Sequence, residues 1–281
     1  MSNRKPHQIP RIYYVFLYIM LIMGVLIIAY PLIWGFMTAF KPSNEIAVFP
    51  PKLMPSRFTL NNFIRAFNFQ PIFLFLRNSV IQVTIITIGQ LITATMAAYA
   101  FARLEFIGRN FLFYLSLSSM MIPIQVIMVP LYAFITSLGW YDTYVGLTFP
   151  FLAHGFSIFL LRQAFLNIPR DIEEAAVIDG CGRLRVLFYV LIPSAKASIG
   201  AATIFTAVYH WNTYIWPLLV SSSSQIRTVQ PGLAMFVEIE AGTDVGRLMA
   251  AAIVVAAPTV GAFLLGQRSF VRGVTMSGIK G

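Results

Sequence analysis

The chain has 281 residues, of which 58% are hydrophobic and only 11% are charged. Soluble domains carry about 25% charged residues, so the composition excludes an ordinary water-soluble core and predicts an integral membrane protein. The formal net charge of +10 comes from basic residues scattered between apolar runs. This scatter is typical of cytoplasmic loops in membrane proteins and argues against a nucleic-acid partner. Cys181 is the only cysteine, which excludes an intrachain disulfide.

Six apolar segments are long enough to cross a bilayer, which takes about 20 residues per helix. Their apolar runs are continuous rather than alternating, which predicts helices and excludes barrel strands. The first run is too long for a cleavable signal peptide, so we expect it to be retained. The expected spans lie near Ile12–Phe36, Val80–Phe101, Phe111–Phe134, Tyr144–Phe165, Ala197–Leu219 and Leu248–Phe270. We therefore predict an all-α integral membrane protein with one transmembrane domain over residues 1–281.

An even number of spans places both termini on one side of the membrane. With the termini in the cytoplasm, thirteen of the twenty Lys and Arg residues lie inside and seven outside, which agrees with the known bias. Residues 41–77 then form an extracytoplasmic loop, and residues 167–196 form a cytoplasmic loop. The outer loop is rich in proline at first, and apolar residues then recur at helical spacing over 60–67. This second part predicts a short amphipathic helix on the outer membrane face, in contact with lipid.

The cytoplasmic loop contains signals for two helices. Asn167 and Pro169 suit the start of a helix, acids follow in its first turn, and Gly180 can end it in a left-handed conformation. Asp179 lies where an anion is mildly unfavourable, which suggests a donor or cation outside the loop. Apolar residues then recur at helical spacing before Pro193, namely Leu184, Leu187, Phe188 and Leu191. A helix–turn–helix presented to a partner explains all of these features. A capped surface helix that only joins two spans is the alternative.

This loop resembles the EAA loop of the permease subunits of bacterial ABC importers. The pattern is Glu-Ala-Ala, three residues, Gly, nine residues, an aliphatic residue, two residues and Pro. The matching residues are Glu174, Ala175, Ala176, Gly180, Val190 and Pro193. Other segments resemble the carbohydrate branch of the family, and in particular the second, maltose-type permease: Asn78-Ser79, Ala97–Arg103, Met121-Ile122-Pro123, Phe159–Gln163, Trp211-Asn212, Trp216-Pro217-Leu218 and Phe270–Gly273. The chain departs from the usual pattern at Cys181-Gly182 and at Thr213.

The resemblance implies the type I ABC importer permease fold, with six transmembrane helices and a cytoplasmic coupling loop. It implies a pore subunit in the bacterial inner membrane that imports sugars or oligosaccharides and is not itself an enzyme. The expected partners are a homologous permease, two ATPase subunits and an extracytoplasmic solute-binding protein. The ATPase subunits would bind ATP, so no cofactor is expected in this chain. The residues implied in ATPase coupling are Glu174, Ala175, Ala176, Asp179, Gly180 and Pro193.

The sequence lacks the motifs of several other kinds of site. It has no phosphate-binding Gly-x-x-x-x-Gly-Lys-Ser/Thr, no Gly-x-Ser-x-Gly and no cluster with metal-ligand spacing. The alternative to an importer permease is an ion-coupled secondary transporter, and a membrane scaffold without a pore is a third possible function. Ion-coupled carriers usually place acids or histidines within spans, whereas all ten acids here fall in loops or at span edges. We interpret His154 and His210 as interior residues.

Candidate pore residues lie in the third and fifth spans. Asn212, Tyr214 and Trp211 lie near the outer half of the fifth span, and Gln125 lies between two prolines that we expect to kink the third. Apolar walls with a few amides and aromatic rings suit sugars. The sequence therefore predicts a substrate pathway along these residues. A place in the interfacial aromatic belt is the alternative for Trp211, and contact with a neighbouring helix is the alternative for Gln125.

Overall fold

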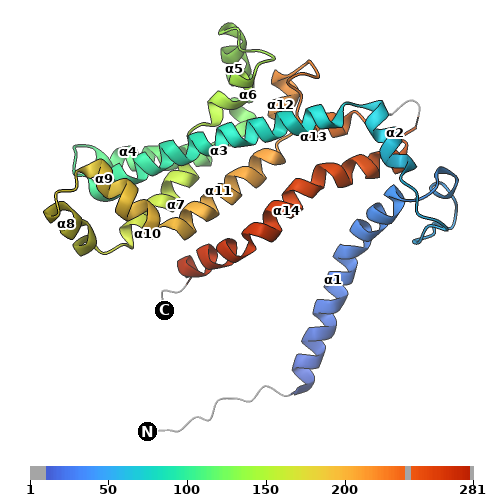
Figure 1. Cartoon of the computed structure of the whole chain (residues 1–281), viewed down its shortest axis with the longest axis horizontal. Helices are drawn as coiled ribbons and strands as arrows, with labels where there is room; N and C mark the ends of the chain where they lie inside the picture. Colours follow the sequence, from blue (N-terminus) through green and yellow to red (C-terminus); the bar gives the residue numbers. More distant parts are fainter. Residues whose placement is uncertain (1–10, 238–241, 279–281) are drawn as a thin grey trace. The chain divides into compact units, whose positions relative to one another are not determined.

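The computed structural model describes residues 11–237 and 242–278, and every regular element in these ranges is a helix (Figure 1). The α-helices are α1 (Arg11–Ala39), α2 (Asn61–Phe69), α3 (Ile72–Arg103), α4 (Arg109–Ser118), α5 (Ile124–Ser137), α6 (Tyr144–Thr148), α7 (Gly155–Leu166), α8 (Arg170–Ile178), α9 (Arg183–Val186), α10 (Ile192–Ser194), α11 (Lys196–Trp211), α12 (Ile215–Val220), α13 (Val229–Ala234) and α14 (Val245–Gly278). Short 3-10 helices are η1 (Ser43–Glu45), η2 (Ser119–Met121) and η3 (Phe149–Phe151), and η4 (Leu187–Leu191) is a π-helical turn. The prediction of an all-α protein is confirmed.

In the part of the chain that the structure describes, the helices account for up to six membrane spans by length and composition. Three are long and apolar enough to cross alone: Tyr13–Ala39, Ile72–Arg103 and Val245–Leu264. Three others are pairs bent by 98°, 45° and 80°, respectively Arg109–Met121 with Ile124–Ser137, Tyr144–Phe151 with Gly155–Leu166, and Arg183–Ser194 with Lys196–Trp211. Five of these spans lie at predicted places, whereas the pair Arg183–Ser194 with Lys196–Trp211 begins inside the segment predicted as a cytoplasmic loop. The bend in the third span was predicted from its prolines, and the bend in the fourth span was not.

The bend in the third span has a local cause in proline. Pro123 lacks an N–H and disfavours helical backbone in the residue before it, so the chain leaves the helix at Ile122 and α5 starts at Ile124. The predicted kink at Pro123 is confirmed. Pro130 lies inside α5 and does not end it.

The fifth span also ends earlier than predicted, so the single helix expected over Ala197–Leu219 is wrong. Helix α11 stops at Trp211, and α12 starts only at Ile215. The side chains between them bond back to the last turn: Asn212 Nδ2 donates to Val208 O at 2.7 Å and Thr213 Oγ1 to Tyr209 O at 3.1 Å. Such local side-chain bonds compete with continuation of the helix.

The chain divides into two compact units, residues 1–69 with 236–253 and residues 70–235 with 254–281. In the larger unit, α3, α7 and α11 pack side by side (Figure 1). Ala94, Ala98 and Ala102 are buried on one face of α3 at intervals of four residues, against Leu161 and Phe165 of α7. Small side chains let helices approach closely in a membrane, where packing drives their association.

The smaller unit is built around the end of α1. Most of α1 is exposed, for example Ile27 at 73% and Ile28 at 71%, as expected for a helix surrounded by lipid. Asn62 of α2 is buried, and its Nδ2 donates to Ala39 O at 3.0 Å and Lys41 O at 2.8 Å. It thereby satisfies carbonyls that the end of α1 leaves free. The helix predicted over 60–67 is confirmed as α2, and its contact with lipid stays a prediction.

Candidate functional site

The loop 167–196 forms α8 and a second helical stretch made of α9, η4 and α10, at the C-terminal end of α3 (Figure 1). Pro169, with an extended ψ of 138°, precedes the first residue of α8, so Asn167 does not cap this helix as predicted. Asn167 instead follows the last turn of α7, where its N–H bonds to Gln163 O. The first turn of α8 contains Asp171 and Glu173, as expected from the helix dipole.

Gly180 ends α8 in the left-handed conformation that the sequence predicts, with φ at +86°. The Gly180 N–H donates to Val177 O at 3.0 Å, and the Cys181 N–H donates to Ala176 O at 2.9 Å. These two bonds form a Schellman motif, in which a left-handed residue closes the helix. The turn directs the chain into α9 after only a few residues.

Most of the residues predicted to couple to an ATPase are exposed. Glu174, Ala175, Asp179, Gly180 and Pro193 are exposed, and Ala176 is half-buried against the core of the larger unit. Large apolar side chains accompany them, with Ile178 exposed at 85%, Leu184 at 64% and Phe188 at 58%. The apolar series after Gly180 is divided, because Leu187 and Leu191 are buried while Leu184 and Phe188 are exposed. The segment therefore has one face fixed to the protein and one face free of it.

A cavity of about 510 Å³ lies beside the gap between α11 and α12. The structure brings three of the four predicted pathway residues to its wall: Gln125 from α5, and Asn212 and Tyr214 from the gap. Trp211 lies elsewhere, because consecutive positions on a helix differ by about 100°. Its indole is buried and donates through Nε1 to Val255 O at 3.1 Å. Tyr209, Trp216 and Phe151 add aromatic rings to the cavity wall.

A carboxylate outside the spans fixes the segment that follows α12. Asp142, between α5 and α6, accepts hydrogen bonds through Oδ1 from the N–H groups of Ser222 and Ser223 at 2.9 and 3.1 Å. Burial raises the pKa of Asp142, but the hydrogen bonds from Ser223 and Ser222 outweigh it and hold the pKa below its usual value. The ionised carboxylate thus ties the segment after α12 to the start of α6.

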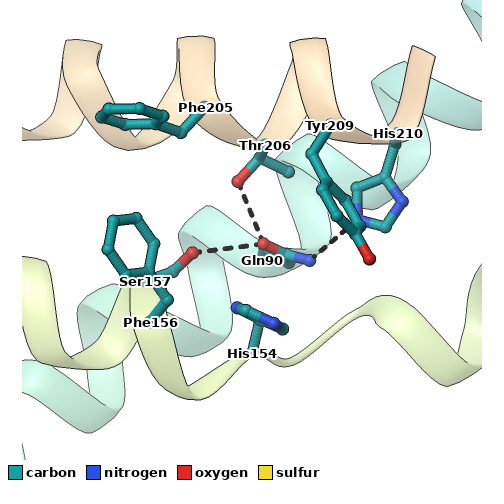
Figure 2. Close-up of a pocket in the computed structure, with 8 residues that line it drawn as sticks. All are labelled: Gln90, His154, Phe156, Ser157, Phe205, Thr206, Tyr209 and His210. Carbon is teal, nitrogen blue, oxygen red and sulfur yellow. Dashed lines mark hydrogen bonds between the residues drawn. The ribbon is translucent and has the colours of Figure 1, made fainter. Parts of the chain in front are cut away.

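A second cavity, of about 200 Å³, shares Tyr209 and His210 with the first and lies beside a polar network (Figure 2). Gln90 of α3 is at its centre. Its Oε1 accepts from Ser157 Oγ at 3.2 Å and Thr206 Oγ1 at 3.0 Å, and its Nε2 donates to Phe151 O at 2.9 Å. The same Nε2 lies 3.3 Å from His210 Nε2. One side chain therefore joins α3, α7 and α11.

The bonds to Gln90 also fix the state of His210. Because the Gln90 amide nitrogen is a donor, His210 Nε2 accepts, and a neutral ring carries its proton on Nδ1. His210 is buried. A neutral histidine held by a neutral amide matches the interpretation of His210 as an interior residue rather than a proton relay. The same interpretation is wrong for His154, which is exposed.

Gln90 and Arg103 are site residues that were not predicted from the sequence. Gln90 is an amide in an apolar span, and Thr93, one turn further on, donates to Leu152 O at 2.7 Å. Together they satisfy carbonyls at the break in the fourth span, which is the condition for a broken helix in a membrane. Arg103, at the end of α3, forms an ion pair with Glu173 of α8. Polar residues on the apolar face of a span were the available signal for both.

A helical membrane protein with bent spans, an amide-lined cavity and an exposed helix–turn–helix belongs to the class of transport-system membrane subunits. Residues 90–274 match the family described as binding-protein-dependent transport system inner membrane component, and the chain belongs to this family. The chain is 38% identical over 266 residues to the probable ABC transporter permease protein YurM of Bacillus subtilis, covering 94% of this chain and 88% of that protein. It is 34% identical over 270 residues to the sn-glycerol-3-phosphate transport system permease protein UgpE of Yersinia enterocolitica, covering 94% and 96%.

Two solved structures share the fold. A bacterial ABC transporter involved in the import of the acidic polysaccharide alginate superposes with a TM-score of 0.86 at 21% identity, covering 96% of this chain and 100% of that chain. A bacterial alginate ABC transporter in complex with an alginate pentasaccharide-bound periplasmic protein gives 0.66 at 14% identity, covering 91% and 92%. The protein is thus the transmembrane pore subunit of an ABC importer in the inner membrane, and not an enzyme. This membership excludes the ion-coupled carrier.

Proposed function

We propose that the exposed surface of residues 170–193 docks on an ATPase subunit, and that the cavity beside Gln125, Asn212 and Tyr214 is this chain's part of the solute pathway. The complete importer would contain a homologous permease, two ATPase subunits and an extracytoplasmic solute-binding protein. Both termini would lie in the cytoplasm, on the same side as the docking surface. ATP-driven closure of the ATPase pair would move α8 and alternate the access of the cavity.

The observation that carries this proposal is the exposed face of α8 and α9. Ile178 is 85% exposed and Leu184 64%. Ile178 lies one helical turn after Glu174 and directly before Asp179, and both acids are exposed. A polar helix with acids does not suit the lipid core, and apolar side chains of this size on one surface are typical of a protein interface. The Schellman turn at Gly180 holds the two helices in fixed positions.

We further propose that the solute is an uncharged molecule rich in hydroxyl groups, such as a sugar or oligosaccharide. The residues that line the cavity beside Asn212 offer amides, hydroxyls, an imidazole and aromatic rings, and among these described residues none carries a fixed charge. Burying an anion in a low-dielectric cavity requires a paired cation. A neutral sugar can stack its apolar face on rings such as Tyr209 and bond its hydroxyls to amides.

The test is to express the chain with the proteins of its gene cluster and to purify the complex. We expect an ATPase to co-purify, and import into proteoliposomes to require ATP and to survive a protonophore. A carrier that stops with the protonophore and ignores ATP would refute the proposal. Competition between neutral oligosaccharides, glycerol 3-phosphate and a uronate oligomer tests the solute class. Stronger competition by either anion would refute the uncharged solute while leaving the importer function intact.

A further inference from the structure

Two adjacent acids of α8 lie in different surroundings. Successive residues of a helix point about 100° apart, so the exposed face that includes Glu174 leaves Glu173 turned toward the protein. The Glu173 side chain is 14% exposed and forms an ion pair with Arg103, whose side chain is 6% exposed. The sequence pattern gives both acids the same role at the start of a helix, but the structure separates them.

Arg103 holds the loop at two points. Besides its ion pair with Glu173, it donates through Nη2 to Ile168 O at 2.7 Å, on the connection between α7 and α8. The apolar side of the same junction is formed by Ala176 and Cys181, which pack against the core cluster that contains Ala102. Helix α8 is therefore fixed to the end of α3 by a buried charge pair as well as by packing.

Helix α3 leads from this junction directly to the cavities. Gln90 lies thirteen residues before Arg103 on the same unbroken helix, a distance of about 20 Å at 1.5 Å per residue. Gln90 bonds to Ser157 and Thr206, and lies beside His210 at the wall of both cavities. The end of α3 is thus connected to the walls of both cavities by one helix and one side-chain network, because His210 lines both.

We propose that Arg103 and Glu173 are positioning residues that transmit the movement of α8 to α3, and through α3 to the solute pathway. This inference rests on the proposed function. Under this inference the two acids have different roles. Glu174 faces the ATPase and contributes to docking, whereas Glu173 faces the pore subunit and contributes to coupling. Removing one partner of a buried ion pair leaves an uncompensated charge, so each single substitution disturbs the junction strongly.

The experiment uses the complete importer in proteoliposomes and measures the ATP hydrolysed per solute imported, together with ATPase co-purification. Glu173→Gln and Arg103→Met each remove one charge. We expect both to raise the ATP used per solute about tenfold, with ATPase co-purification unchanged. Arg103→Lys keeps the charge and should be milder. The reversed pair, Arg103→Glu with Glu173→Arg, restores opposite charges but loses the donor to Ile168 O, so it should recover part of the coupling. Glu174→Gln is the contrasting variant, and we expect it to reduce co-purification.

The outcomes separate the two ideas. A wild-type complex without ATP-driven import refutes the proposed function. Import by the wild type, with an unchanged ATP-to-solute ratio in both Glu173→Gln and Arg103→Met, refutes the inference. A reversed pair that is no better than the worse single variant also refutes it. If a single variant fails to accumulate in the membrane, the Arg103→Lys variant and the reversed pair test the inference instead. Both keep a positive charge opposite a negative charge at the junction.

Discussion

The left-handed turn at Gly180 allows a quantitative test of the docking segment. Its φ of +86° suits glycine, and a Cβ built there meets no atom within 4 Å. A larger side chain at this position therefore disturbs the backbone rather than the packing. Gly182 provides the matched control two residues away, because it also has open space but an ordinary extended backbone, with φ at −72° and ψ at 163°.

The magnitude follows from the backbone. A left-handed conformation costs an L-residue about 1–2 kcal/mol, and β-branching adds to this. If the turn changes to avoid this strain, it loses the bonds from Gly180 and Cys181 to the end of α8, each worth about 0.5–1.5 kcal/mol. In either case Gly180→Val raises the free energy of the docking-competent geometry by about 2 kcal/mol, which lowers the population of that geometry about thirtyfold. Asn tolerates this region better, so Gly180→Asn should be milder.

The assay is ATPase co-purification and ATP-driven import for Gly180→Val, Gly180→Asn and Gly182→Val. We expect the order of activity to be wild type, then Gly182→Val and Gly180→Asn, with Gly180→Val far lower. Equal losses in Gly180→Val and Gly180→Asn would remove the backbone argument. A loss in Gly182→Val as large as that in Gly180→Val would show that any added side chain blocks this surface.

Three further substitutions or labels test other parts of the structure. Glu174→Lys should weaken ATPase association by about 2–5 kcal/mol, as expected when an interfacial charge loses its partner, while membrane insertion persists; wild-type import would contradict this. Cys181, which is half-buried, should react with a membrane-impermeant maleimide only from the cytoplasm and more slowly with ATPase bound; labelling from outside would overturn the orientation. Gln90→Leu removes the partner of Ser157 on α7 and of Thr206 on α11, and each buried group left unpaired costs about 1–3 kcal/mol. Import and melting temperature should therefore both fall, and an unchanged melting temperature would contradict the network.

The overall arrangement of the fold could be predicted because long, continuous apolar runs form membrane-spanning helices in lipid. All six spans, the helix at 61–69 and the left-handed turn at Gly180 follow from local patterns. The bends were harder to predict. Pro123 indicates its own kink, but the break after Trp211 depends on whether Asn212 and Thr213 bond to the preceding turn or continue the helix, and hydropathy does not distinguish the two.

The site was predicted in part for a similar reason. The coupling residues form a contiguous pattern in the sequence, so the exposed surface around Glu174 could be recognised from it. The ion pair between Arg103 and Glu173 joins residues seventy positions apart, and such pairing depends on how the helices pack. Tyr209 and Trp211 illustrate the same limit, because only the direction in which α11 faces decides which of them reaches the cavity.

The break in the fourth span has a consequence for how the protein is made. The carbonyls of Phe151 and Leu152 are satisfied by Gln90 and Thr93 of α3, and hydrocarbon offers no substitute donor. A fourth span that left the translocon alone would expose these carbonyls to acyl chains. The order of the chain avoids this, because α3 is synthesised first. We expect the double variant Gln90→Leu with Thr93→Val to delay insertion of the fourth span, which a translational arrest peptide placed after that span would detect as a later pulling force on the nascent chain. Insertion at the normal chain length would argue against this order of assembly.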